Sequence, residues 1–147
     1  MSSSKCLKKA SDMTGDSVAF RLIKETGVLK YPASSDAEDV LGFNYIVYDN
    51  GTCYEYYAAN PPLVGMTQPV PVSYPLGLAV FDTPKIDYKQ AVKLFHSGNW
   101  GSKFTSILLC KPLHPDVKDP SWYFVSDLGA HVIINANTGD IKSIDVG

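Results

Sequence analysis

Clustered charge and long apolar runs are both missing from this 147-residue chain. Charged residues make up only 19% of it, the formal net charge is −2, and the lysines and arginines are scattered. A nucleic-acid surface needs clustered basic side chains, so we expect no nucleic-acid partner. No segment has the apolar length that spans a bilayer, and the first ten residues lack the apolar core of a signal peptide. We therefore expect a cytoplasmic protein without a membrane partner.

Cysteine is scarce, with only Cys6, Cys53 and Cys110. An odd number cannot form a closed disulfide framework, and thiols in the cytosol stay reduced. The sequence contains no Cys-x-x-Cys pair or comparable ligand spacing, so it predicts no metal site. Cys53 and Cys110 both fall in predicted strands, where burial would raise the thiol pKa and disfavour a nucleophilic role.

The strong catalytic signatures are also missing. The sequence has no Gly-x-Ser-x-Gly elbow, no glycine loop that would cradle a phosphate, and no His-Glu-x-x-His helix. We therefore predict no catalytic residue and no cofactor, and we lean towards a protein that is not an enzyme.

What is present is enough apolar material for one core, because hydrophobic residues make up 45% of the chain. Residues 1–14 are rich in serine and lysine without periodicity, which predicts a flexible tail. Residues 15–147 are expected to form a single α+β domain.

The first half of that domain contains one unambiguous signal. From Phe43 to Ala59 the apolar residues recur with period two around Asn50-Gly51, which predicts a hairpin that pairs Tyr45 with Tyr56. Before it, residues 16–27 are predicted as a short helix, with a strand as the alternative. Residues 35–42 are predicted as a helical turn whose capping box joins Ser35 to Glu38.

Prolines fill residues 60–77, so this stretch is predicted to be an extended connector, in part an edge strand. Asp87 and Gln90 then cap a helix that ends near Gly98. Four strands follow, over residues 103–110, 121–125, 131–136 and 141–146. The predicted fold is an antiparallel sheet of roughly four to six strands with one main helix packed across it.

Residues Ile86 to Ile144 resemble a PepSY-type module, with an amphipathic helix, a Trp-Tyr strand and a strand that runs into Ala-x-Thr-Gly-Asp-Ile. The ending is also similar to that of small bacterial immunity proteins of cystatin-like or NTF2-like fold. Asn135 stands where many PepSY modules have aspartate, and their usual export signal is missing here. The resemblance therefore implies an immunity-type inhibitor that occludes a toxin or enzyme, with a cystatin-like or PepSY-like fold.

Aromatic residues are the remaining candidates for function, because tyrosine and tryptophan give large contact area with a polar handle. If exposed together, they would mark a protein-binding face. The Asn50-Gly51 turn and the proline-rich loop around His114 are the segments expected to reach into a partner. The predicted partner-binding residues are Tyr48, Tyr57, Trp100, His114 and Tyr123.

Two other classes of function stay open at this stage. One is an NTF2-like or SnoaL-like small-molecule carrier or enzyme, with a pocket between helix and sheet lined by His96, Trp100, Tyr123 and His131. The other is a structural or assembly subunit, which a large apolar homodimer patch would indicate. A deep apolar pocket would favour the small-molecule carrier or enzyme, whereas a filled core with exposed aromatic residues would favour a protein-binding protein.

Overall fold

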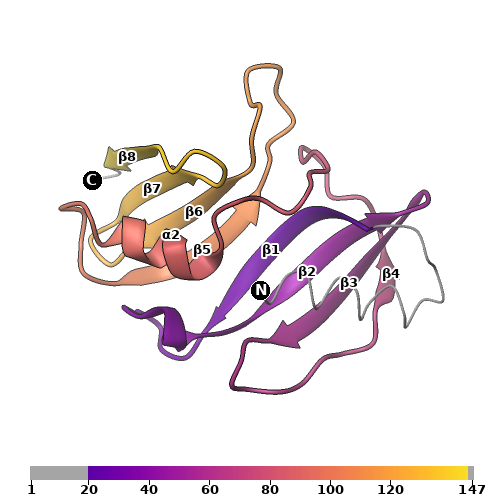
Figure 1. Cartoon of the computed structure of the whole chain (residues 1–147), viewed down its shortest axis with the longest axis horizontal. Coiled ribbons are helices and arrows are strands. Elements are labelled where there is room, and N and C mark those ends of the chain that lie inside the picture. The colour runs from indigo at the N-terminus through magenta and orange to yellow at the C-terminus, as the bar shows by residue number, and fades with distance from the viewer. Residues whose placement is uncertain (1–19, 146–147) are drawn as a thin grey trace.

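A single antiparallel sheet of eight strands runs through the computed structural model, which describes residues 20–145 (Figure 1). The strand order is β4-β3-β2-β1-β5-β6-β7-β8. The strands are β1 (Arg21–Leu29), β2 (Val40–Asp49), β3 (Thr52–Ala59), β4 (Val70–Val72), β5 (Phe104–Cys110), β6 (Ser121–Ser126), β7 (Ala130–Asn135) and β8 (Ile141–Asp145). The predicted tail, residues 1–14, lies outside the described residues.

The predicted fold class is wrong. Eight strands replace the expected four to six, and within residues 20–145 the only helical elements are the eight-residue helix α2 (Tyr88–Phe95) and the 3-10 turn η1 (Ala37–Asp39). The fold is therefore mostly β, not the cystatin-like or PepSY-like α+β arrangement. The difference arises in the first half of the chain, which contributes β1 to β4 to the same sheet as the C-terminal strands.

Strand β1 replaces the helix that was predicted for residues 16–27, and the part of that prediction before Phe20 lies outside the described residues. A register shift between Leu22 and Lys24 interrupts the period-two pattern, so Leu22 and Ile23 are both buried. Beyond it, Glu25 pairs with Tyr45 and Leu109 and is 1% exposed. Because of this register shift and the inward-facing carboxylate of Glu25, β1 does not show the alternation of apolar and polar residues that identifies a strand in a sequence.

The hairpin predicted around Asn50-Gly51 is confirmed. Both turn residues have positive φ, 49° and 86°, as a two-residue hairpin turn requires. Tyr45 pairs with Tyr56 as predicted, and their rings stack with centroids 5.1 Å apart. This pair lies on the face of the sheet that carries the core, which we call the inner face.

The predicted helical turn at 35–42 is shorter than expected, because η1 ends at Asp39 and β2 begins at Val40. The predicted capping box used the carboxylate of Glu38. Instead, Asp39 accepts hydrogen bonds from the backbone N–H groups of Ser35 and Asp36, at 3.3 and 3.2 Å. The capping residue is therefore one position later than predicted.

Helix α2 lies across the inner face and confirms the helix predicted after Asp87. The Asp87 side chain accepts a hydrogen bond from the Gln90 backbone N–H, and the Trp122 indole donates to the Ile86 carbonyl at 2.9 Å. The buried side chains of α2 are Tyr88, Ala91, Val92 and Phe95.

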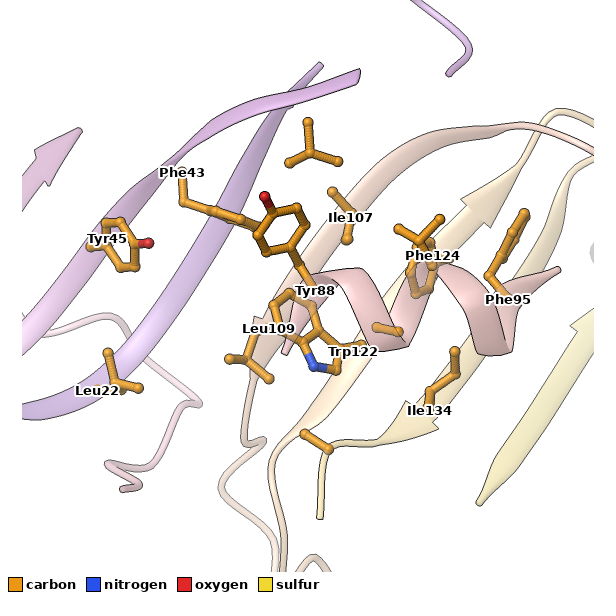
Figure 2. Close-up of a cluster of buried hydrophobic side chains, with 14 of the residues drawn as sticks. Leu22, Phe43, Tyr45, Tyr88, Phe95, Ile107, Leu109, Trp122, Phe124 and Ile134 are labelled. Atoms are coloured by element: carbon orange, nitrogen blue, oxygen red, sulfur yellow. The ribbon is translucent and has the colours of Figure 1, made fainter. Parts of the chain in front are cut away.

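The core fills the space between α2 and the sheet (Figure 2). Phe95 is fully buried and stacks on Phe124, with ring centroids 4.9 Å apart. At the other end of α2, Tyr88 meets Phe43 edge to face at 5.4 Å. Burying each such ring contributes about 1.5–3 kcal/mol, so the helix and the sheet stabilise each other.

The C-terminal strands agree with the sequence prediction. β5 lies between β1 and β6, the interior position that its two apolar faces indicated. The turn between β7 and β8 contains Gly139 with φ of 83°. The two halves of the sheet join where β1 pairs with β5, through Lys24, Glu25 and Thr26.

The two edges of the sheet differ. β4 spans three residues and has Pro71 at its centre, opposite Tyr54. β8 spans five residues, contains no proline and, within residues 20–145, pairs only with β7. A proline lacks the N–H that a further strand would need, so the β4 edge is poorly suited to pairing.

Gly27 is a point of close contact in the core. A Cβ atom at this position would lie 3.2 Å from the carbonyl oxygen of Ile107 and well inside van der Waals contact with its Cγ2. The side chains of Phe43 and Ile107 therefore approach each other over a residue that has no side chain.

Gly27→Ala is expected to destabilise the protein by about 1–3 kcal/mol, because overpacking displaces the fully buried Ile107. Chemical denaturation measures the free energy of unfolding. Ser106→Ala, at an exposed position of the neighbouring strand β5, is the control and should change it by less than about 0.5 kcal/mol. Equal stability of Gly27→Ala and the wild type would contradict this packing.

Candidate functional site

Two loops come together beyond one end of the sheet, where the segment after β4 meets the segment after β5 (Figure 1). The Ala79 N–H donates to the Lys111 carbonyl, and the Leu113 N–H donates to the Gly77 carbonyl, both at 2.8 Å. Leu78 and Pro112 form a β-bridge between these bonds. We call this structure, residues 74–79 and 111–114, the paired lip.

The paired lip exposes large apolar side chains. Leu76 is 97% exposed and Leu113 is 71% exposed, while Tyr74 is 41% exposed. Tyr74 is fixed on both sides, because its hydroxyl donates to the Leu78 carbonyl at 2.9 Å and its ring meets Tyr48 edge to face. Large apolar side chains exposed on backbone that is held by hydrogen bonds make this surface a candidate for binding another molecule.

His114, the last residue of the paired lip, begins a tight turn. The Asp116 backbone N–H donates to His114 Nδ1 at 3.1 Å, and the Val117 N–H donates to the His114 carbonyl at 3.0 Å. The imidazole side chain is 60% exposed. The loop is therefore held by its own hydrogen bonds while the ring stays accessible.

The base of the same loop is held by Asp119. Its carboxylate accepts a hydrogen bond from the Asn137 side chain at 2.9 Å and another from the Asn135 side chain at 3.2 Å. These two bonds, that of Asn137 first, lower the pKa of Asp119. The carboxylate thus joins the loop after β5 to the turn between β7 and β8.

The five predicted partner-binding residues do not form one surface. Tyr48 and His114 lie at or beside the paired lip. Tyr57 and Tyr123 lie half-buried on the face of the sheet opposite the core, in register with Asn44 and Ile133. Trp100 packs over Gly98 on the α2 side and donates its indole N–H to the Phe95 carbonyl.

Within residues 20–145, the predicted pocket between helix and sheet, lined by His96, Trp100, Tyr123 and His131, is not formed. His96 and Trp100 both contact the ring of Phe95, which fills the space with Phe124. Tyr123 and His131 alternate with buried core residues and therefore lie on the opposite face of the sheet. The structure does not bring the four side chains together.

The cysteine thiols of the described chain are poor nucleophiles. Cys53 and Cys110 are free and buried, and burial raises the pKa of both thiols, although the charge of Lys24 opposes the increase at Cys110. Residues 20–145 also contain no group of three side chains placed to hold a metal ion. No helix within that range has the length and apolar character needed to cross a membrane.

Comparisons with protein-family models, with curated proteins and with solved structures find no match to this chain. The resemblance of residues 86–144 to PepSY-type modules and immunity proteins therefore stays a prediction. The candidate site must be judged on its geometry alone.

The two leucines of the paired lip, Leu76 and Leu113, were not among the predicted binding residues. Each stands in a segment that proline and glycine exclude from a regular strand, Pro75-Leu76-Gly77 and Pro112-Leu113-His114. An apolar residue next to such neighbours is a weak sign of exposure. No local signal shows that two loops separated by more than thirty residues pair with each other.

Asp119→Ala is expected to lower the melting temperature at neutral pH, because it removes the acceptor of both asparagine bonds. The folded pKa of Asp119 lies below its unfolded value, so this contribution is present above the unfolded pKa and is lost as pH falls through the folded pKa. The difference from the wild type should therefore shrink in acid. Thermal unfolding across an acid series measures it. Asp116→Ala on the same loop is the control, and a difference that grows in acid would contradict the assignment.

Proposed function

We propose that this chain is a non-enzymatic binding protein that docks onto a protein partner through the paired lip. The observation that carries the proposal is the exposure of Leu76 and Leu113, 97% and 71%, on two loops that hydrogen-bond to each other. Anchors of this kind gain affinity when a partner's apolar pocket removes them from water.

Pre-organisation of the lip supports the same role. The loops are held in place before binding by the two backbone hydrogen bonds between them and by the bond from the Tyr74 hydroxyl. The hydrogen bond from the Asn137 side chain to Asp119 holds the base of the second loop. A loop that is already ordered loses less conformational entropy when it binds. The contact with the partner can therefore be small and still specific.

An inhibitory role is the form of this proposal that we favour. Exposed leucines on loops that lie beyond the end of a sheet suit insertion into a concave site, such as the active-site mouth of a toxin or enzyme. The protein would then act by occlusion, as an immunity-type protein does. Free thiols at Cys53 and Cys110 support a reducing, cytoplasmic setting for the complex.

Leu76→Glu and Leu113→Glu are each expected to weaken the complex at least tenfold, about 1.4 kcal/mol or more, because a carboxylate would enter an apolar pocket. The partner is captured from extracts of the source cells, purified, and titrated calorimetrically against each variant. Leu128→Glu is the matched control, since Leu128 is 73% exposed in the turn between β6 and β7, away from the lip.

The melting temperature of all three variants should match that of the wild type, because each leucine is exposed. Alanine at Tyr48 or His114 should weaken the complex less than the glutamate variants do. If alanine at Tyr57 or Tyr123 weakens binding and the leucine variants do not, the partner binds the outer face of the sheet and the lip assignment is wrong.

A further inference from the structure

A second surface lies on the α2 side of the molecule and plays no part in the proposed contact. It is a cleft of about 530 Å³ between helix α2, η1 and the loop that follows β3. This volume lies in the range of small-molecule sites, about 300–1,000 Å³. Its apolar lining includes Val40, Pro61, Leu63 and Val92.

The walls of the cleft carry opposite charges. Asp36 and Glu38 of the η1 segment line one side, and Lys89 and Lys93 of α2 line the other. Within residues 20–145, none of these four forms an ion pair, so the opposed charges do not meet across the cleft. A ligand with an ammonium group and a carboxylate would complement both walls.

The buried residue Asn60 provides a separate indication of a ligand. It lines the cleft and is only 3% exposed. Its amide nitrogen donates to the Val40 carbonyl at 2.9 Å, while its Oδ1 accepts no hydrogen bond from the described chain. Burying an unpaired polar atom costs about 1–3 kcal/mol, so a donor that enters the cleft and reaches Oδ1 would be favoured.

The two charged walls are held relative to each other. His96 at the end of α2 hydrogen-bonds through Nε2 to the carbonyl of Ser35, the residue before the η1 segment. Leu63 is fixed by its backbone N–H, which donates to the Asn60 carbonyl at 2.9 Å. The cleft is therefore largely formed before any ligand enters.

We propose that this cleft binds a short apolar peptide with free termini. The α-ammonium group lies towards Asp36 and Glu38, and the carboxylate lies towards Lys89 and Lys93. Apolar side chains cover Val92 and its apolar neighbours, and a peptide N–H donates to Asn60 Oδ1. A single amino acid supplies both charges but no peptide N–H, so it should bind more weakly.

Calorimetric titration of the full chain with L-leucyl-L-leucine tests the proposal. We expect saturable binding, with N-acetyl-leucyl-leucinamide at least about tenfold weaker because both terminal charges are removed. The dipeptide methylated on its peptide nitrogen should bind about two- to tenfold more weakly, since it cannot donate to Asn60. This probe tests Asn60 without altering a residue whose side chain also supports the fold.

Glu38→Gln and Lys93→Gln should each weaken dipeptide binding about two- to fivefold, the range of exposed ion pairs. Asp140→Asn and Lys142→Gln make the same chemical changes at exposed positions outside the cleft, and they should leave binding unchanged. Lip variants such as Leu76→Glu should also bind the dipeptide normally, which separates this proposal from the proposed function.

Three results would overturn the proposal. One is the absence of saturable binding at millimolar dipeptide. Another is equal affinity for the free and the blocked dipeptide, because the charged walls would then contribute nothing. The third is equal affinity for leucine and the dipeptide, which would remove the role assigned to the peptide N–H and Asn60.

Discussion

The packing of α2 against the inner face of the sheet is the interaction on which the rest of the structure depends. An eight-residue helix is unstable alone, and an apolar sheet face is unstable in water. The helix and the sheet bury each other's apolar side chains, as where Phe95 of α2 stacks on Phe124 of β6. The helix is also fixed at both ends, by Trp122 at the Ile86 carbonyl and by Trp100 at the Phe95 carbonyl. The side of α2 that faces away from the core, which forms a wall of the cleft, is therefore held in position as firmly as the side that faces the core.

The two candidate surfaces are built from different residues and differ in their chemistry. The lip exposes large apolar side chains, whereas the cleft carries opposed charges around an apolar floor. In the part of the chain that the structure describes, buried rings such as Phe95 and Phe124 fill the space between α2 and the sheet, where the small-molecule hypothesis expected a pocket. Because the two surfaces share no residue, a variant can remove one and leave the other intact.

Local chemistry explains which elements the sequence predicted. The Asn50-Gly51 hairpin and the Asp87 cap depend on residues next to each other in the chain, and both are confirmed. For β1 the helix was preferred and the strand was only the alternative, because Glu25 faces inward and a register shift breaks the alternation that identifies a strand. Tyr48 and His114, which lie at the paired lip, were predicted as binding residues from residue type. The pairing of distant loops and the position of Asn60 in the cleft depend on the whole sheet and leave no local pattern.

The unequal edges of the sheet limit how copies of this protein can associate. Among residues 20–145, no strand covers the β8 edge and its backbone groups are available for another strand, while Pro71 interrupts the β4 edge. Two copies can therefore join β8 to β8 about a twofold axis, and each then presents only its proline-bearing edge outward. Strand addition stops at a pair, so the geometry disfavours growth into a fibril.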